Sequence, residues 1–259
     1  MLFRSREDED VSAAIQSILE NEGIAVHVGA DDIGFARQGS DMAVTFSAGK
    51  PHSVGSHVLL ALGRTPNTDD LGLDRAGVEV DKRGFVSVDD QLRTSVPGIW
   101  AIGDCNGKGA FTHTSYNDYE IVAANLLDND QRKVSDRIET YGLFIDPPLG
   151  RCGMTEAAVK KSGRRALVGQ RPMTRVGRAV EKGETQGFMK ILVDADTKEI
   201  LGAAFLGMSG DEVIHCVLDV MYAKAPYTVL KRAMHIHPTV AEFLPGILDD
   251  LAPLPEPAS

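Results

Sequence analysis

Two histidines, a proline and a glutamate lie within the segment HIHPTVAEF at 235–243, near the end of the chain. Pro238 directly after His237 favours a helix that begins there, with His237 at or just before the cap. Glu242 would then lie about one and a half turns into the helix, within reach of an imidazole nitrogen. Such a contact fixes the tautomer of His237 and favours its charged form, so this histidine could move protons near neutral pH. The segment alone fits a surface histidine at a helix start beside an unrelated glutamate equally well.

A Gly-Asp pair in the segment TSVPGIWAIGDCNGKGAFTHTSYND is the second candidate for chemistry. We expect a buried strand over 99–102 that delivers Gly103 and Asp104 at its carboxyl end, where open α/β sheets bind ligands. Glycine lets a ligand approach, and the carboxylate accepts hydrogen bonds from sugar-like hydroxyls. The segment FTHTS precedes a helix predicted over 116–127 and would aim backbone N–H groups at an electron-rich ring. Taken alone, a capping aspartate in a loop is the commoner explanation.

The elements that must position these residues begin with two blocks of α/β character. The first, over 1–57, combines a helix around 11–19 with strands at 24–28 and 42–46. The second, over 58–132, starts on the apolar run HVLLALG, which we expect to be a strand buried on both faces. A further strand, GFVSV, follows the turn-rich segment GRTPNTDDLGL.

The third block, over 133–250, changes rhythm and predicts an α+β domain with an antiparallel sheet and helices to one side. Strands are expected at 139–145, 187–194 and 199–207, and the last two are joined like a hairpin across ADTKE. The remaining residues, 251–259, contain PLPEPAS and are predicted to be a disordered tail.

Composition limits the classes of partner. A net charge of −10 at pH 7 argues against nucleic acid and anionic membranes, because the summed field repels phosphates. The chain contains no apolar run near the roughly 20 residues that span a bilayer, and its first residues do not resemble a signal peptide, so we expect a cytoplasmic protein. Cys105, Cys152 and Cys216 form neither a CxxC nor a CxxxxC pair and predict buried thiols. His215 and Cys216 lack the companions of a metal site, and no metal is predicted.

Four ordered segments together resemble one family, the FAD-dependent pyridine nucleotide-disulfide oxidoreductases. TSVPGIWAIGD resembles the second flavin-binding motif of that family, and HPTVAE resembles its C-terminal His-Pro-Thr…Glu motif. LLALGRTPN is similar to the stretch where the chain leaves the NAD(P)H domain and re-enters the FAD domain. FIDPPLGRCGMTEAAV is similar to the entry of the dimerisation domain. The resemblance is greatest to the branch of mercuric-reductase-like and reactive-chlorine-resistance flavoproteins, beside dihydrolipoamide dehydrogenase.

The resemblance implies a role for each matched residue. Asp104, after Gly103, would bind hydroxyls in the ribityl–diphosphate part of FAD, and Thr112 would present its backbone near the flavin ring. Gly63 would line the NAD(P)H site. His237 would donate and accept the proton of a dithiol or leaving thiolate, held by Glu242. The family also implies a two-fold homodimer, with the interface formed mostly by residues from about 138 onward.

The predicted fold class is an α/β remnant of NAD(P)- and FAD-binding domains followed by an α+β dimerisation domain with an antiparallel sheet. The sequence contains neither the GxGxxG that cradles the FAD pyrophosphate nor the CxxxxC redox pair, so we expect the C-terminal part of a reductase that is inactive alone.

By family, the predicted function is electron transfer from NAD(P)H through FAD to a small-molecule or protein disulfide or a related oxidant. The alternative is a non-catalytic dimerisation or interaction fragment derived from such a reductase. Mercury reduction is disfavoured, because the C-terminal end LDDLAPLPEPAS lacks the vicinal cysteines of mercuric reductases.

Overall fold

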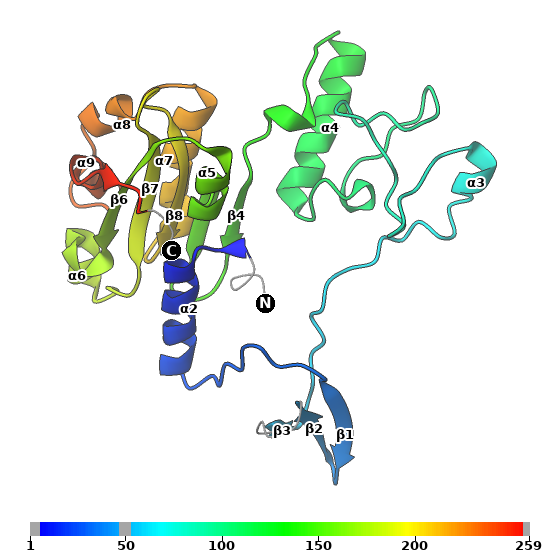
Figure 1. The fold of residues 1–259 in the computed structure, drawn as a ribbon, viewed down its shortest axis with the longest axis horizontal. Helices are drawn as coiled ribbons and strands as arrows, with labels where there is room; N and C mark the ends of the chain where they lie inside the picture. Colours follow the sequence, from blue (N-terminus) through cyan, green and yellow to red (C-terminus); the bar gives the residue numbers. More distant parts are fainter. Residues whose placement is uncertain (1–5, 47–52, 256–259) are drawn as a thin grey trace. The chain divides into compact units, whose positions relative to one another are not determined.

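The computed structural model describes residues 6–46 and 53–255, which form two compact units (Figure 1). The sheet unit combines the residues up to His27 with those from Ile138 onward, and the pocket unit runs from Val28 to Arg137. Each unit is built around its own buried apolar residues. Among the described helices, none has the length and apolar character needed to cross a membrane.

The sheet unit is organised around a six-stranded antiparallel sheet with the order β4-β5-β8-β7-β6-β9. All seven residues of β7 and all seven of β8 are buried, because both faces of the sheet are covered. The predicted hairpin is confirmed: β7 and β8 are antiparallel neighbours joined by a short turn. The strands are β4 (Thr140–Leu143), β5 (Leu149–Gly153), β6 (Ala166–Pro172), β7 (Phe188–Asp194), β8 (Ile200–Leu206) and β9 (Ala252–Pro253).

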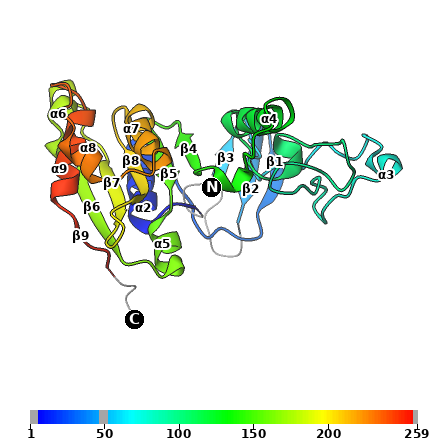
Figure 2. The same ribbon diagram turned by 90° about the horizontal axis from the view of Figure 1, so that it is seen from above.

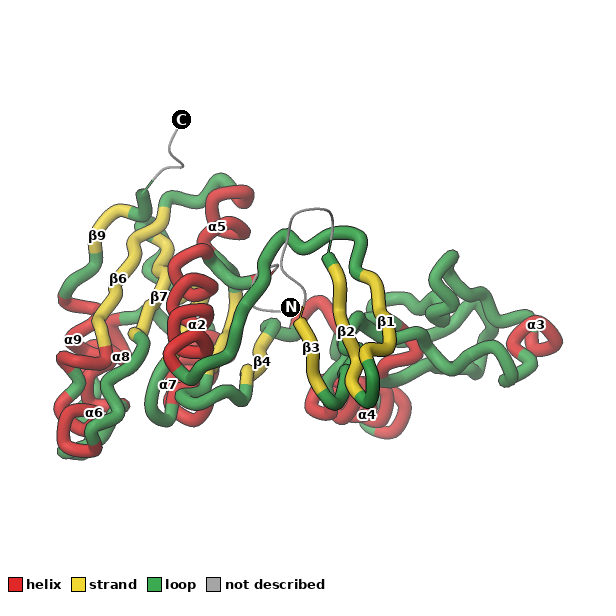
Figure 3. Tube along the Cα trace, turned by 90° about the horizontal axis from the view of Figure 1, so that it is seen from below, coloured by secondary structure: helices red, strands yellow, loops and turns green. Residues whose placement is uncertain are grey.

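Helices cover the two faces of this sheet unequally, as Figures 2 and 3 show from opposite sides. Four helices pack their apolar residues on one face together with Met189, Ile191 and Val193 of β7. The other face is covered by α2, predicted around 11–19 and confirmed, and by the short α5, whose Val159 packs on Leu192. The prediction of helices to one side of the sheet is therefore wrong. The first set is α6 (Gly177–Lys182), α7 (Gly210–Tyr222), α8 (Thr228–Arg232) and α9 (Leu244–Asp249); the second is α2 (Glu9–Asn21) and α5 (Glu156–Ser162).

The predicted disordered tail is wrong for residues 251–255. β9 pairs with β6 through Leu167 and Val168, and the Leu254 amide donates to the Ala166 carbonyl over 2.9 Å. Leu254 also packs against the apolar cluster around Val159. Pairing with the edge strand β6 and the apolar contact of Leu254 are enough to order this proline-rich segment. Residues 256–259 of the predicted tail lie outside the described residues.

The pocket unit contains a three-stranded antiparallel sheet and one long helix. β1 pairs with β2, and β2 with β3, which confirms the strand predicted at 42–46 except at its last residue. Val78, Val86 and Ala101 form a small separate core. The elements are β1 (Gly34–Gln38), β2 (Asp41–Thr45), β3 (Ser53–Gly55), α3 (Leu73–Ala76), α4 (Thr112–Leu127) and the 3₁₀ turns η1 (Asp104–Asn106) and η2 (Val134–Asp136).

Four predicted strands, at 24–28, 57–63, 84–88 and 99–102, are wrong, because the structure has no strand at these positions. Isolated bridges at Val86 and Trp100 are all that forms there among the described residues. The apolar run predicted to be buried instead leaves Leu59 90% and Leu62 85% exposed. A central strand of a parallel sheet needs hydrogen-bonded neighbours on both sides, and no described strand pairs with these segments.

Candidate functional site

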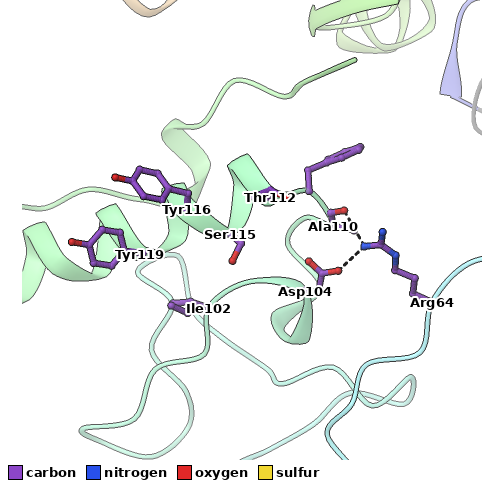
Figure 4. Close-up of a pocket in the computed structure, with 9 residues that line it drawn as sticks. Arg64, Ile102, Asp104, Ala110, Thr112, Ser115, Tyr116 and Tyr119 are labelled. Carbon is purple, nitrogen blue, oxygen red and sulfur yellow. Dashed lines mark hydrogen bonds and ion pairs between the residues drawn. The ribbon is translucent and has the colours of Figure 1, made fainter. Parts of the chain in front are cut away.

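An open pocket of about 640 Å³ in the pocket unit brings together three of the motif segments (Figure 4). Arg64, directly after Gly63, and Asp104, directly after Gly103, lie side by side in its wall. The first turns of α4 complete the wall. We name it the Asp104 pocket, and its lining residues are Arg64, Ile102, Asp104, Ala110, Phe111, Thr112, Ser115, Tyr116 and Tyr119.

One guanidinium joins the three segments of this pocket. Arg64 Nη1 donates to Asp104 Oδ2 over 2.7 Å and to the Ala110 carbonyl over 3.1 Å. Both side chains of the ion pair are more than half exposed, at 68% and 51%, so the pair adds little to stability. Its effect is geometric: Oδ2 of Asp104 faces Arg64, and Oδ1 has no hydrogen-bond partner among the described residues. Arg64 was not selected as a site residue from the sequence. Its ion pair with Asp104 joins residues 40 positions apart, and no local sequence pattern predicts such a contact.

Gly103 lies where the Asp104 turn comes close to α4. Its backbone has φ 78° and ψ −160°, and a Cβ built there would lie 2.8 Å from Ser115 Oγ. Both the torsion and the contact disfavour a side chain at this position. The sequence prediction that Gly103 lets a ligand approach stays a prediction, and the structure shows that α4 itself comes close to this glycine.

We expect Gly103→Ala to destabilise the pocket unit by about 1–3 kcal/mol, because it adds a steric clash to an unfavourable positive φ. Gly98→Ala is the matched control, since Gly98 also has a positive φ, 86°, but nothing within 4 Å of its Cβ position. Chemical denaturation of both variants measures the difference. Equal losses would mean that only the torsion matters and that Ser115 can move away.

Thr112 is the first residue of α4, four positions before the predicted helix start at 116. The Thr114 hydroxyl donates to the Phe111 carbonyl and accepts from the Phe111 amide, which closes the first turn. This local cap lets the helix begin within FTHTS and places its N-terminal backbone at the pocket. Gly63 has a positive φ of 116° and an exposed backbone with nothing near its Cβ position.

The pair predicted between His237 and Glu242 forms in the sheet unit. His237 Nδ1 lies 2.7 Å from Glu242 Oε2. Because a carboxylate only accepts, Nδ1 carries the hydrogen, and in the neutral imidazole Nε2 is then the acceptor. The side chain of His237 is 80% exposed, whereas that of Glu242 is only 16% exposed. The largely buried carboxylate therefore holds the ring through Nδ1, and Nε2 is left on the exposed side chain.

The helix predicted to begin at Pro238 is wrong in its start. Residues 234–240 are not helical, the His237–Pro238 peptide bond is cis, and Glu242 lies in a 3₁₀ turn over Ala241–Phe243 that continues into α9. The Thr239 hydroxyl accepts from the Glu242 amide over 3.3 Å and donates to the Ile236 carbonyl. Thr239, and not His237, therefore accepts a hydrogen bond from an amide of this turn.

The cysteines are not activated nucleophiles. Cys105, Cys152 and Cys216 are all free thiols. Burial raises the pKa of Cys152 to about 12 and also raises the pKa values of Cys105 and Cys216. Cys105 lies beside Asp104 in the chain, but its thiol donates to the Ile102 carbonyl and stays protonated near neutral pH.

A buried ionic cluster that the sequence analysis missed lies beneath α2 in the sheet unit. Lys190 of β7, with a side chain 1% exposed, reaches Asp10 at 2.8 Å and Glu156 at 2.7 Å. Asp8 lies 3.1 Å from the same ammonium. Burial disfavours the charge of Lys190, but the hydrogen bonds that its ammonium donates to Asp10 and Glu156 outweigh this effect and raise the pKa of Lys190. Three carboxylates spaced for a metal ion thus enclose a lysine ammonium instead.

The cluster continues along one row of the sheet. Tyr141, Arg151, Ala204 and Lys190 are paired neighbours on four strands, so their side chains share the face covered by α2. Arg151, 2% exposed, lies 3.7 Å from carboxylates of Glu7 and Asp8. Tyr141 donates to Glu7, and burial together with that bond raises the pKa of Tyr141.

Comparison with known proteins places both units in one family. Residues 1–118 match the profile "Pyridine nucleotide-disulphide oxidoreductase", and residues 140–246 match "Pyridine nucleotide-disulphide oxidoreductase, dimerisation domain". The chain belongs to the pyridine nucleotide-disulphide oxidoreductases. The predicted family and fold class are thereby confirmed.

Relatives resemble nearly the whole chain but are about twice as long. The probable pyridine nucleotide-disulfide oxidoreductase RclA of Escherichia coli (strain K12) is 36% identical, over 94% of this chain and 55% of RclA. The dihydrolipoyl dehydrogenase of Cupriavidus necator is 31% identical, over 93% of this chain and 52% of its own length. The solved structure described as "HOCl-induced flavoprotein disulfide reductase RclA from Escherichia coli" superposes with a TM-score of 0.88 at 34% identity, covering 94% of this chain and 56% of that one.

Proposed function

We propose that the chain works as part of an FAD-dependent NAD(P)H oxidoreductase of the disulfide-reductase type, which passes electrons to a disulfide or a related oxidant. The observation that carries this proposal is the Asp104 pocket. It gathers the residue after Gly63, the Gly103–Asp104 turn and the start of α4 at Thr112, which are the segments that the family resemblance assigns to the nicotinamide and flavin cofactors. RclA and the dihydrolipoyl dehydrogenases support the same class of chemistry by name.

The residues of the pocket fit part of an FAD molecule. Asp104 Oδ1 has no hydrogen-bond partner among the described residues and can accept from ribityl hydroxyls. The N-terminus of the 16-residue helix α4 offers backbone N–H groups and the positive end of its dipole to an electron-rich ring. When bound, FAD would supply the acceptor for a hydride from NAD(P)H. Asp104, Thr112 and Gly63 would then bind and orient the cofactors.

His237 is proposed as the proton donor and acceptor for the thiol side of the reaction. With Nδ1 bonded to Glu242, its Nε2 can take a proton from a thiol or return one to a thiolate. Glu242 holds the ring in one tautomer and stabilises the imidazolium that forms. In an RclA-like or dihydrolipoyl-dehydrogenase-like assembly the chain would act as a homodimer in the cytoplasm, built on residues of the dimerisation domain.

Titration of the purified chain with FAD tests the proposal. We expect quenching of flavin fluorescence and a shifted visible spectrum, both reduced in Asp104→Asn. Asp89→Asn is the matched control, because Asp89 is an exposed loop aspartate paired with an arginine in the same unit but outside the pocket. No binding by the wild-type chain would contradict the cofactor assignment and favour the non-catalytic dimerisation module, for which analytical ultracentrifugation would then show a dimer without flavin.

A further inference from the structure

A buried carboxylate lies directly behind the turn that presents Asp104. Asp118, two turns into α4, has a side chain only 3% exposed, and it faces the Gly103 backbone and not solvent. Its Oδ2 accepts from the Gly103 amide over 2.9 Å and from Asn106 Nδ2 over 2.8 Å. Its Oδ1 accepts from the Arg137 guanidinium. The two oxygens therefore have separate partners, the turn on one side and a cation on the other.

Asn106 extends this network across the whole turn. Its Nδ2 also donates to the Ala101 carbonyl over 3.0 Å, and its Oδ1 accepts from the Lys108 amide over 2.8 Å. The side-chain amide of Asn106 thus bonds to the backbone of residues 101 and 108, and Asp118 links the same amide to α4. Gly103 also packs close to this helix, because a Cβ there would lie 2.8 Å from Ser115 Oγ.

We propose that Asp118 is a positioning residue of the Asp104 pocket: it fixes the Gly103–Asp104 turn on α4 and so directs the Asp104 carboxylate toward a hydroxyl-bearing ligand. The inference rests on the proposed flavin function of Asp104 but concerns a residue outside the pocket lining. An aspartate is required because both oxygens act as acceptors. Asparagine must turn its NH₂ group either to the two donors of the turn or to the Arg137 guanidinium, and either choice loses an acceptor. Arg137 supplies the positive charge that makes a buried carboxylate tolerable.

The test compares Asp118→Asn with Asp128→Asn, FAD being the probe and fluorescence quenching the measurement. Asp128 is the exposed C-cap of the same helix, so its replacement controls for the loss of one negative charge from α4. We expect Asp118→Asn to weaken FAD binding by about tenfold or more, from the loss of hydrogen bonds to a charged group, and Asp128→Asn to leave it unchanged. Equal affinities in the two variants would overturn the proposal.

A double-mutant cycle with Asp104→Asn separates positioning from general stability. If Asp118 acts through Asp104, the Asp118→Asn change should cost much less FAD affinity once Asp104 is already replaced. Fully additive losses would mean that Asp118 only stabilises the unit. Should Asp118→Asn fail to fold, Asn106→Ala removes one donor to Asp118 and keeps the Arg137 ion pair, and the same cycle applies.

Hydrogen exchange gives a readout that needs no cofactor. Asp118→Asn should accelerate exchange of the Gly103 amide, while amides in the middle of α4 keep their protection. If the wild-type chain does not bind FAD, the proposed function fails, and the role of Asp118 is then decided by this exchange. Acceleration confined to residues 101–108 supports it, and unchanged or uniformly increased exchange overturns it.

Discussion

Replacing Lys190 with methionine is expected to lower the free energy of unfolding of the sheet unit by about 3–5 kcal/mol, because it removes a buried cation from the buried Asp8 and from the partly exposed Asp10 and Glu156. The ammonium is enclosed by Asp8, Asp10 and Glu156 at 3.1 Å or less, and its side chain is 1% exposed. Methionine has a similar volume, so the expected loss reflects charge and hydrogen bonding and not a cavity. Urea denaturation followed by far-UV circular dichroism measures it.

Lys160→Met is the matched control for this prediction. Lys160 pairs with the same Glu156, but at 3.8 Å and at the surface of α5, where an ion pair contributes about 0.2–1 kcal/mol or nothing. We expect this control to change the free energy of unfolding by less than about 1 kcal/mol. Similar losses in the two variants would show that burial adds nothing and that the cluster is dispensable.

The acidic partners of Lys190 come from two segments that lie far apart in the sequence. Asp8 and Asp10, in the acidic run REDED at 6–10, face the buried lysine. Glu156, in the Gly-x-Thr-Glu segment that resembles the entry of the dimerisation domain, meets the same lysine from the first turn of α5. A long-range cluster of this kind leaves no periodic signal, so the sequence alone could not predict it.

What the sequence predicted well was local. The β7–β8 hairpin needs only two neighbouring apolar runs and a turn, and the contact between His237 and Glu242 joins residues five positions apart. The predicted strand at 57–63 was wrong because apolar character fixes burial only when neighbouring strands are present to bury it. Asp118 and Arg64 were missed for a different reason: each meets its key partner at least 15 positions away through a side chain that is unremarkable for its local element.

Helix α2 packs on strands that are far from it in the sequence. The sequence places residues 9–21 in the nucleotide-domain block over 1–57, and those domain boundaries stay a prediction. In space, Val11, Ile15 and Ile18 of α2 pack with Leu149, Phe188 and Leu206 of the sheet. Together with the Lys190 cluster at its N-terminus, this apolar face makes α2 one wall of the sheet unit.

Ile15→Ala is therefore expected to destabilise the sheet unit by about 2–5 kcal/mol, although Ile15 is more than a hundred residues from the sheet in sequence. Ile15 is fully buried and sits at the centre of the α2 contact, so its loss leaves a cavity against the sheet. Ser17→Ala is the control on the exposed side of the same helix and should change stability by less than about 0.5 kcal/mol. Urea denaturation gives both values, and hydrogen exchange in β7 and β8 locates the effect. If Ile15→Ala left those strands fully protected and cost no more than the control, α2 would be an appendage on a sheet that is stable without it; the expected loss instead makes it a structural part of the unit that carries His237 and Glu242.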